Sequence, residues 1–340
     1  MDGLEVVTPC RLHLGLLDLN GALGRVDGGL GVALAEPSVV LRAYSSPRWS
    51  IPPALAEVVA TVRSHLRGLP PSRLELLQSI PPHVGLGSQT QLRLAVADLL
   101  SRLADRPMRT DALATLVGRG GTSGIGVHAY DQGGVLLDGG HALSVKGGFL
   151  PSRYSKAPPP PLLCRLPIPP QWRFVLLRGP GRGVAGRREL EVFADSTPIP
   201  RREVERIAHL MVMGLLPAVA DQDAQGFGAS LDALQGVGFK AIENQLRGKG
   251  GANLRQRLRA AGTYGAGLSS FGPTVFGLAE SPAHAVEVVE SLRQMRGAGR
   301  LDVRVCSGSV SGARVRSAPP GTDRRQHRVR PSPPSSSAKP

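Results

Sequence analysis

The chain of 340 residues is poor in aromatic residues and contains no long apolar run. Aromatic side chains make up 4% of it, so a folded core must be built mainly from aliphatic residues. Apolar residues still reach 41%, which is near the globular norm and allows two α/β domains with a sizeable core. No apolar run approaches the roughly 18 residues that a membrane-spanning helix needs, so we expect no membrane partner.

Lysine is also scarce, because it accounts for only five of the 41 basic residues. The net charge of +15 would suit a nucleic-acid-binding protein, but the arginines are scattered and form no basic run interleaved with aromatics. The guanidinium fork binds phosphate and carboxylate with paired hydrogen bonds, so we expect small anionic ligands and no nucleic acid. A nucleic-acid binder is the non-enzymatic alternative, and it would require steeply salt-dependent binding by the chain without its tail.

Cysteine is the third scarce residue. Cys10, Cys164 and Cys306 are odd in number and far apart, which excludes a disulfide framework and any standard pattern of metal-binding cysteines. The first residues, MDGLEVVTP, are acidic and strand-like and do not resemble a signal peptide. We therefore expect a soluble, cytoplasmic protein with reduced thiols.

Strand and helix patterns alternate along the chain, which predicts an α/β or α+β fold with two layers. Apolar residues at helical spacing, with arginines on the opposite face, predict amphipathic helices over 53–68 and 90–105. Further helices are expected at 202–220, at 223–246 in one or two pieces, and at 281–296; strands are expected at 4–9, 37–44, 173–179, 274–280 and 301–307.

The proline-rich stretch APPPPLLCRLPIPPQW (157–172) marks a candidate domain boundary, because a polyproline run resists both helix and central strand. We place an N-terminal domain at 1–160 and a C-terminal domain at 161–316. A rigid surface loop inside one fold is the alternative. Residues 317–340 are rich in proline, serine and charge, and cannot bury enough apolar surface to offset their ordering entropy. We predict that they form a disordered basic tail.

A short glycine-rich loop directly precedes the predicted helix at 90–105. Backbone N–H groups of such a loop and of the first helical turn point at one spot, and this arrangement binds anions. A short glycine motif is weak evidence by itself, and its place before an amphipathic helix strengthens it. The expected ligands of a phosphate or diphosphate are Gly85, Leu86, Gly87, Ser88, Gln89 and Thr90.

The segment TPCRLHLGLLDLNGALGRVDGGLG (8–31) concentrates charged residues among glycines, which allow tight turns. This composition fits a loop that receives a phosphorylated ligand with its metal ion. A glycine-rich hairpin with solvated charges fits it equally well. The charged residues of the segment are Arg11, His13, Asp18, Arg25 and Asp27.

Two further segments are dense in glycine. GRGGTSGIGVHAYDQGGVLLDGGH (118–141) contains His128 and His141, whose spacing fits no standard zinc pattern, so ordinary hydrogen-bonding roles are expected. AGTYGAGLSSFGPTVFGL (261–278) is expected to form either a second phosphate-binding loop or a tightly packed turn. The candidate substrate-binding residues of the glycine-rich segments are Arg11, His13, Thr122, Ser123, Ser269 and Ser270.

Three of these segments, TPCRLHLGLLD, the PxxxGLGS pattern at 81–88 and GAGLSSFG at 265–272, occur in an order that resembles the GHMP superfamily. That superfamily is named for galactose, homoserine, mevalonate and phosphomevalonate kinases. The resemblance implies a two-domain α/β (α+β) GHMP-kinase-like fold whose central loop wraps a diphosphate. It also makes a homodimer the expected assembly.

One departure from the superfamily pattern bears on the reaction. Many of these kinases have a serine-glycine-x-aspartate motif, whose aspartate works beside the reacting hydroxyl. In SGIGVHAYDQGG (123–134) the aspartate position is Gly126, and Asp131 is out of step. Glycine can neither accept nor orient a proton, so the usual general base is missing. Gln89 and Thr90 also replace the small residues usual in kinases. The pattern thus favours a diphosphate-binding site that does not carry out the kinase reaction.

A narrower resemblance covers the chain up to about residue 316. RLHLGLLDLNGALGRVDGGLGVAL, VGLGSQTQL, GRGGTSGIGVHAYDQGG, LDGGH and GLSSFGPTV are similar, in order and spacing, to β-ribofuranosylaminobenzene 5′-phosphate synthases. The resemblance implies the joining of phosphoribosyl pyrophosphate to p-aminobenzoate with release of CO₂ and pyrophosphate, an early step of tetrahydromethanopterin biosynthesis. It implies Mg²⁺ and no ATP. The sequence leaves open whether the arene is p-aminobenzoate or an analogue such as 4-hydroxybenzoate.

The implied chemistry suggests roles for the charged residues. Mg²⁺ between pyrophosphate oxygens prefers hard oxygen ligands, so Asp18 and Asp27 are the expected metal ligands and Asp138 a weaker one. A carboxylate near the ribose would also stabilise an oxocarbenium-like transition state. Arg25 is expected to bind phosphate or the arene carboxylate. Asp18, Arg25 and Asp27 are therefore the expected catalytic residues. The alternative function is an ATP-dependent GHMP kinase for a small alcohol or phosphorylated sugar, which ADP formation would reveal.

Overall fold

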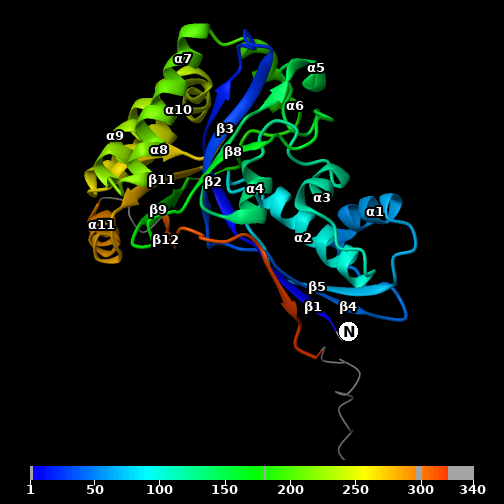
Figure 1. Cartoon of the computed structure of the whole chain (residues 1–340). Coiled ribbons are helices and arrows are strands. Elements are labelled where there is room, and N and C mark those ends of the chain that lie inside the picture. Colours follow the sequence, from blue (N-terminus) through cyan, green and yellow to red (C-terminus); the bar gives the residue numbers. More distant parts are fainter. Residues whose placement is uncertain (1–2, 180, 296–300, 321–340) are drawn as a thin grey trace, which may run out of the picture.

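The computed structural model describes residues 3–179, 181–295 and 301–320. Figure 1 shows two groups of helices and strands with a long, blue hairpin between them. The order of elements is mixed, with helices and strands alternating along the chain, as the sequence predicts. Among the described helices, none combines the length and the apolar character needed to cross a bilayer.

The first sheet is antiparallel and joins the two ends of the described chain. Its strand order is β13-β1-β4-β5, so the C-terminal strand β13 pairs with the N-terminal strand β1. Helix α2 packs against this sheet, and α1 and α3 pack against α2 (Figure 1). The elements are β1 (Leu4–Val7), β4 (Val40–Ser45), the 3₁₀ turn η1 (Pro53–Leu55), α1 (Ala56–His65), β5 (Ser72–Gln78), α2 (Ser88–Leu103), α3 (Thr110–Leu116) and β13 (Arg314–Ser317).

The second sheet contains the central hairpin and has the order β2-β3-β6-β8, with the short strand β7 added beside β3. Of the two arrangements that fit segment 8–31, a ligand-binding loop and a glycine-rich hairpin, the segment has the backbone of a hairpin. Its elements are β2 (Cys10–Asp18), β3 (Arg25–Leu34), α4 (Ile125–Gln132), β6 (Val135–Asp138), β7 (His141–Ala142), α5 (Leu143–Lys146) and β8 (Leu162–Leu166).

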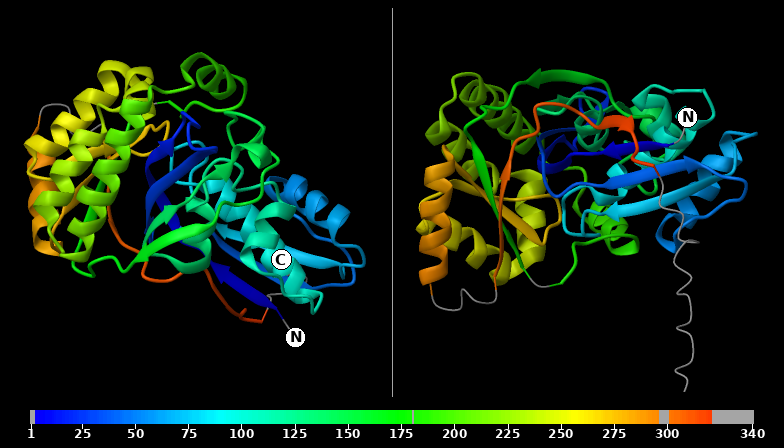
Figure 2. Two further views of the ribbon diagram at one scale, coloured as in Figure 1. Left: turned by 45° about the horizontal axis from the view of Figure 1, so that its top comes forward. Right: turned by 90° about the horizontal axis from the view of Figure 1, so that it is seen from below.

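The third sheet has the order β10-β11-β9-β12 and is covered by helices on both faces (Figure 2). Alternate residues of β9 enter different cores: Phe174 packs in the cluster that contains Phe227 of α9, and Val175 packs in the cluster that contains Val288 of α11. The elements are β9 (Arg173–Arg178), α6 (Arg187–Ser196), α7 (Arg201–His209), the π-helical turn η2 (Leu210–Leu215), α8 (Leu216–Ala220), α9 (Ala224–Leu234), α10 (Gly238–Ala260), β10 (Tyr264–Leu268), β11 (Thr274–Ala279), α11 (Pro282–Gln294) and β12 (Asp302–Ser307).

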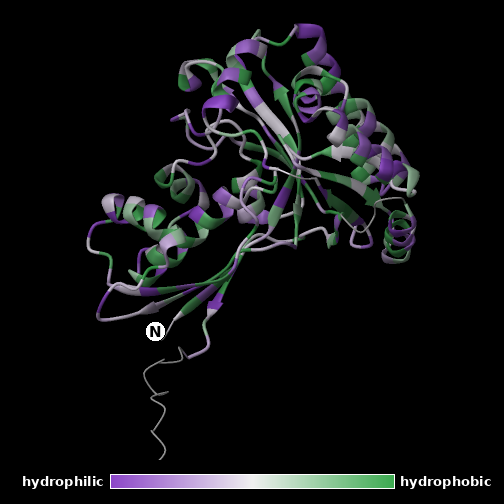
Figure 3. Cartoon of the chain, turned by 180° about the vertical axis from the view of Figure 1, so that it is seen from behind, coloured by the Kyte–Doolittle hydropathy of each residue, from purple (hydrophilic) through white to green (hydrophobic). Residues whose placement is uncertain are grey.

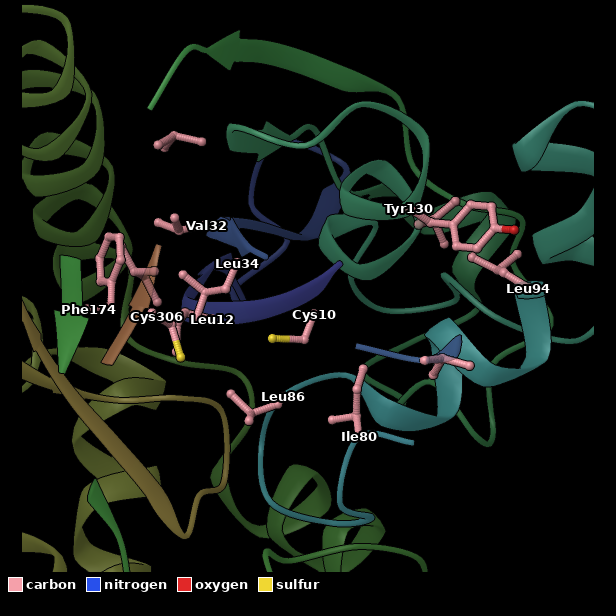
Figure 4. Packing of buried hydrophobic residues seen from close by; sticks show 14 of the residues in the cluster. Cys10, Leu12, Val32, Leu34, Ile80, Leu86, Leu94, Tyr130, Phe174 and Cys306 are labelled. Carbon is pink, nitrogen blue, oxygen red and sulfur yellow. The ribbon is translucent and has the colours of Figure 1, made fainter. Parts of the chain in front are cut away.

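The largest hydrophobic cluster runs from the first sheet through the hairpin into the third sheet. Figure 4 shows Leu12 and Leu34 of the hairpin beside Phe174 and Cys306 of the third sheet. Most of the cluster is aliphatic, in agreement with the low aromatic content. Figure 3 shows hydrophobic residues along the central strands and hydrophilic residues on the outer turns of the helices. Because one core spans both groups of elements, the surfaces that face each other across the hairpin are held in a defined arrangement.

The three cysteines are free, as expected. Cys10 and Cys306 are buried in the large cluster, and burial raises the pKa of the Cys306 thiol to about 12. Cys10 donates from Sγ to the Glu36 carbonyl oxygen at 3.2 Å. These thiols are therefore protonated packing groups at neutral pH.

The predicted helices and strands are present with small shifts of their ends. The helix expected at 202–220 is continuous but contains the π-helical turn, and the segment 223–246 forms two helices, α9 and α10. Strand β8 pairs with β6 and β13 pairs with β1, so the sheets cross the predicted boundaries at residues 160 and 316. The division into domains at those residues stays a prediction.

The predicted tail begins too early at residue 317. Ser317 is the last residue of β13 and pairs with Leu4, because the strand continues to hydrogen bond beyond the expected end. Ala318 also donates its N–H to the Gly3 carbonyl at 2.9 Å. The rest of the predicted tail, residues 321–340, lies outside the described residues.

Gly31 of β3 allows α4 to lie close against the hairpin. A Cβ atom at this position would lie 2.3 Å from Cγ2 of Ile125 and 2.6 Å from the Leu12 carbonyl oxygen. We expect Gly31→Ala to lower the free energy of unfolding by about 1–3 kcal/mol, because helix and strand must separate to admit the methyl group. Urea unfolding measures this loss. The matched control is Gly250→Ala in α10, where a Cβ meets nothing within 4 Å; equal stability of the two variants would contradict the prediction.

Candidate active-site cleft

A polar cleft of about 590 Å³ opens where the hairpin, the central glycine loop, α6 and α10 converge. Residues from all four glycine-rich segments of the sequence contribute to it or support it. The residues that line the cleft include Arg11, His13, Leu16, Glu57, Gln89, Arg93, Arg119, Thr122, Ser123, Arg153, Glu189, Phe193, Glu243, Ser270 and Phe271.

The central loop ends at the first turn of α2, as the sequence predicts. Gly85 and Gly87 have φ values of 87° and 78°, a region that L-residues rarely adopt. Gly87 is the N-cap of α2 and no side chain caps the helix, so the first N–H groups are left for another acceptor. Gln89 of this first turn lines the cleft. The loop therefore presents the positive end of a 16-residue helix to the cleft.

Two side chains from distant segments bind the carbonyl oxygen of Gly85. Arg11 donates from Nη1, and Ser269 donates from Oγ at 2.7 Å. The Ser269 hydroxyl in turn accepts the His13 N–H at 3.1 Å, and the Ser270 N–H donates to the His13 carbonyl at 3.2 Å. The hairpin, the central loop and the late serine loop are thus joined in one hydrogen-bonded junction.

His13 is buried at the floor of the cleft and connects it to the third glycine-rich segment. Its Nε2 lies 3.2 Å from the Ser123 Oγ, and its Nδ1 has no hydrogen-bond partner among the described residues. Burial holds the pKa of His13 well below its usual range, and the charges of Arg11 and Lys240 act in the same direction. His13 is therefore neutral near pH 7. One of its ring nitrogens then donates a hydrogen bond and the other accepts one.

Arg11 and Arg119 are partly buried at the cleft, and neither has a carboxylate ion-pair partner in the described part of the chain. Arg11 binds a backbone carbonyl, and Arg119 donates from Nε to the Thr90 Oγ1 at 3.0 Å. Burial lowers the pKa of each guanidinium to about 10, which leaves both charged. Desolvated cations without a counter-ion favour an anionic ligand.

The position of the absent kinase aspartate is filled from the neighbouring helix. A Cβ atom on Gly126 would lie 3.2 Å from Cγ2 and 3.4 Å from Oγ1 of Thr90. The Gly126 carbonyl also accepts from Gln91 Nε2 at 2.7 Å. Two of the three departures from the kinase pattern therefore lie side by side, and a side chain at position 126 would press against Thr90.

The three residues predicted to be catalytic do not line the cleft. The Asp18 Oδ1 accepts the N–H groups of Asn20 and Gly21 at 2.6 and 3.0 Å, which stabilises the hairpin turn. Arg25 donates from Nη2 to the carbonyl oxygens of residues 139 and 140 at 2.9 and 2.8 Å. The Asp27 side chain has no exposed surface. Catalytic roles for these three residues stay predictions, and the hydrogen bonds described here give each of them a structural role.

Asp27 is the centre of a buried charged cluster behind the cleft. Its Oδ2 lies 2.6 Å from the His141 Nδ1 and 2.9 Å from the Lys146 Nζ. Lys146 also donates to the Thr122 Oγ1 at 2.8 Å, which links the cluster to a cleft residue. Asp138 accepts the Gly124 N–H at 2.9 Å, and burial raises its pKa to about 7. The cluster thus fixes the segment that carries Thr122 and Ser123.

The predicted magnesium ligands do not fit a metal site at the cleft. Asp18 and Asp27 are cross-strand neighbours, but Asp27 faces His141 and Lys146 and is closed to the cleft. In the described residues, no group of three or more His, Cys, Asp or Glu side chains is placed to hold a metal ion. Carboxylates at the cleft itself come from Glu57, Glu189 and Glu243.

Comparison with known proteins identifies the family of the chain. The GHMP kinases N terminal domain family matches residues 54–139, and the GHMP kinases C terminal family matches residues 215–296. The chain is 37% identical over 316 residues to the beta-ribofuranosylphenol 5′-phosphate synthase of Methanothermobacter thermautotrophicus, which covers 88% of this chain and 95% of the relative. The chain belongs to the beta-ribofuranosylphenol 5′-phosphate synthase family. The protein of that name from Archaeoglobus fulgidus is 39% identical over 292 residues, covering 84% of this chain and 90% of the relative.

Solved structures with the same fold include several kinases. Homoserine kinase from Cytophaga hutchinsonii superimposes with a TM-score of 0.60 at 15% identity, covering 93% of this chain and 98% of that one. Mevalonate kinase from L. major gives a TM-score of 0.63 at 16% identity, covering 89% and 96%. The predicted α/β GHMP-kinase-like fold is confirmed, and so is the predicted synthase family.

Several cleft residues of this family member were missed in the sequence. Arg93, Arg119, Glu189 and Glu243 lie in helices or turns where a charge is normally solvated, so nothing in the local pattern marks them. Arg93 pairs with Glu57 at 2.5 Å, and the Glu243 carboxylate forms a buried ion pair with Lys240. One signal was present: Lys240 is one of five lysines and follows directly after an apolar helix start.

Arg119 offers a test of the anion site. We expect Arg119→Met to weaken pyrophosphate binding at least about 10-fold, because a hydrogen bond to a charged group contributes roughly 1.5–3 kcal/mol. The free energy of unfolding without ligand should not fall, because the variant removes a desolvated charge that has no counter-ion. Titration calorimetry with pyrophosphate and urea unfolding measure the two effects. Arg109→Met, at an 88% exposed side chain, is the control, and unchanged pyrophosphate affinity in Arg119→Met would contradict the assignment.

Asp27 offers a test of a structural against a catalytic role. We expect Asp27→Asn to lower the free energy of unfolding by about 3 kcal/mol, because Lys146 would be left charged and buried. Asp18→Asn is the matched control on the paired strand, since asparagine also accepts hydrogen bonds in turns. Urea unfolding compares the two. An Asp27→Asn protein of normal stability and no activity would instead support the catalytic role predicted from the sequence.

Proposed function

We propose that the protein joins phosphoribosyl pyrophosphate to a ring carbon of a para-substituted benzoate, with release of pyrophosphate and CO₂. The observation that carries the proposal is the convergence at one cleft of an uncapped helix N-terminus with Arg11 and Arg119, which form no ion pair with a carboxylate among the described residues. Such a site matches a donor with a diphosphate and a separate 5-phosphate. The printed names of the relatives, which describe a ribofuranosyl 5′-phosphate product, support the same class of reaction.

Gly126 supports a transferase that needs no general base. A kinase reaction requires a group beside the acceptor hydroxyl to orient it or take its proton. In the proposed reaction the nucleophile is a ring carbon, and the group lost from that carbon is CO₂, so no proton is removed there. Thr90 fills the position that the kinase base would need. The alternative ATP-dependent kinase therefore lacks a proton acceptor at its usual position.

Two acceptors fit the proposed chemistry. p-Aminobenzoate is the expected arene from the sequence resemblance, and its product is a ribofuranosylaminobenzene phosphate. The relatives are named for a ribofuranosylphenol phosphate, which 4-hydroxybenzoate would give by the same route. Both arenes have a para substituent that donates electrons to the carbon bearing the carboxylate. We propose p-aminobenzoate as the acceptor, with 4-hydroxybenzoate as the second candidate.

The residues of the cleft would act by binding and charge stabilisation. The first turn of α2 would hold the diphosphate, and Arg11 and Arg119 would stabilise the negative charge that grows on it as the bond to ribose breaks. Mg²⁺, when bound, would neutralise part of the pyrophosphate charge. The exposed Glu57 is the cleft carboxylate that could contact such an ion, because the predicted pair Asp18 and Asp27 does not line the cleft. A cytoplasmic location and a homodimer stay predictions.

The test is an incubation with phosphoribosyl pyrophosphate, Mg²⁺ and carboxyl-labelled arene in the absence of ATP. We expect labelled CO₂ and pyrophosphate in equal amounts, with p-aminobenzoate giving the higher kcat/KM. The two arenes are supplied separately and then in competition, and omission of phosphoribosyl pyrophosphate is the control.

A preference for 4-hydroxybenzoate would correct the acceptor and leave the reaction class intact. Release of neither product with either arene, together with ADP formation from ATP and an alcohol acceptor, would overturn the proposal in favour of a kinase.

A further inference from the structure

One wall of the cleft is apolar, although the rest is strongly charged. Leu16 of β2, Phe193 of α6 and Phe271 of the late serine loop form it. Behind them lies Phe239, whose ring centroid is 4.8 Å from that of Phe193 and 5.9 Å from that of Phe271. Phe149 packs against the same cluster, so four of the seven phenylalanines of an aromatic-poor chain gather here. A planar, apolar ring is the ligand feature that such a wall binds.

Glu189 lies next to this wall. It precedes Phe193 by four residues in α6, so both side chains project from the same face of the helix, and both line the cleft. The other cleft carboxylates are engaged, because Glu57 pairs with Arg93 and Glu243 with Lys240. The Glu189 side chain makes no hydrogen bond or ion pair with another described residue. It is therefore the cleft carboxylate available to a ligand.

We propose that Leu16, Phe193 and Phe271 form the subsite for the acceptor arene, and that the Glu189 carboxylate accepts the N–H or O–H of its para substituent. This inference rests on the proposed function and names a residue that selects the substrate.

The chemistry gives Glu189 a role in the transition state. The ring carbon bearing the carboxylate forms the new bond to C1 of ribose, and the C–O bond to pyrophosphate breaks with its electron pair leaving on pyrophosphate. Positive charge then spreads over the ring onto the para nitrogen or oxygen, where a carboxylate at its hydrogen stabilises it. The bond to CO₂ breaks next, and its electron pair restores the aromatic ring. Glu189 is thus expected to raise kcat as well as affinity.

Charged groups on every side of the cleft act on Glu189. Burial raises its pKa to about 7, Arg119 opposes this rise, and the Glu243 carboxylate adds to it. Because the carboxylate form is the acceptor, kcat/KM should rise as the pH increases through about 7. The other charged or titratable groups lining the cleft are Arg11, His13, Glu57, His83, Arg93 and Arg153, and Lys240 pairs with Glu243.

The experiment compares arenes that differ in the hydrogen at the para position. Glu189→Leu keeps the bulk of the side chain and removes the acceptor. We expect its kcat/KM for p-aminobenzoate to fall about 10- to 100-fold, the value of a hydrogen bond to a charged group. 4-(Dimethylamino)benzoate donates electrons but has no N–H, so its kcat/KM should change less than about threefold. Glu189→Gln should flatten the rise of kcat/KM near pH 7.

Glu191→Gln is the matched control on the same helix, since Glu191 pairs with Arg187 and Arg188 away from the cleft. Equal losses for both arenes in Glu189→Leu, or an unchanged pH profile in Glu189→Gln, would overturn the inference while leaving the synthase reaction standing. If the wild-type protein turns over neither arene, the affinity for p-aminobenzoate, measured by equilibrium binding, tests the subsite. An affinity for p-aminobenzoate at least about 10-fold weaker in Glu189→Leu, with Glu191→Gln unchanged, supports the subsite, and equal affinity refutes it.

Discussion

The carbonyl oxygen of Gly85 is the point on which the arrangement of the cleft depends. It accepts hydrogen bonds from Arg11, 74 residues earlier, and from Ser269, 184 residues later. These bonds hold the central loop against the hairpin and the late serine loop, and so aim the first turn of α2 into the cleft. The same junction leaves no room for a side chain at Gly85, where a Cβ would lie 2.4 Å from the Ser269 carbonyl oxygen. A loop made of local glycines is thus given its shape by distant partners.

The cleft has the glycine loop of the kinase pattern but lacks the aspartate of that pattern. Gly126 and Thr90 are two of the three sequence departures from the kinase pattern, and they lie side by side. Gly126 supplies no side chain at the position where the kinase pattern has its aspartate, while the first turn of α2 still faces the cleft. The same fold can carry different reactions, so the proposed loss of pyrophosphate is argued from the residues of the cleft and not from the fold.

Two groups of charged residues, one behind the cleft and one at it, differ in how their charges are balanced. Behind the cleft, Asp27 is matched by Lys146 and His141, so the buried charges compensate one another and hold the chain in place. At the cleft, Arg11 and Arg119 lack carboxylate partners in the described residues, and their desolvation is a cost that a bound anion would offset. The charges behind the cleft are thus compensated within the protein, whereas those of Arg11 and Arg119 would be compensated by the anionic ligand that we propose.

The sequence by itself determined the class of fold, the helices at 53–68 and 90–105, the glycine loop before the second of them, and the family. These features are local, because helical periodicity and a glycine loop before a helix are written in neighbouring residues. Only the tertiary structure decided which charges reach the cleft. Asp27 follows a turn and looks solvated, yet pairing with β7 and α5 buries it. Glu189 looks like an ordinary surface charge, yet the packing of α6 turns it towards the cleft. Burial and proximity depend on contacts between segments far apart in the chain, and no local pattern encodes them.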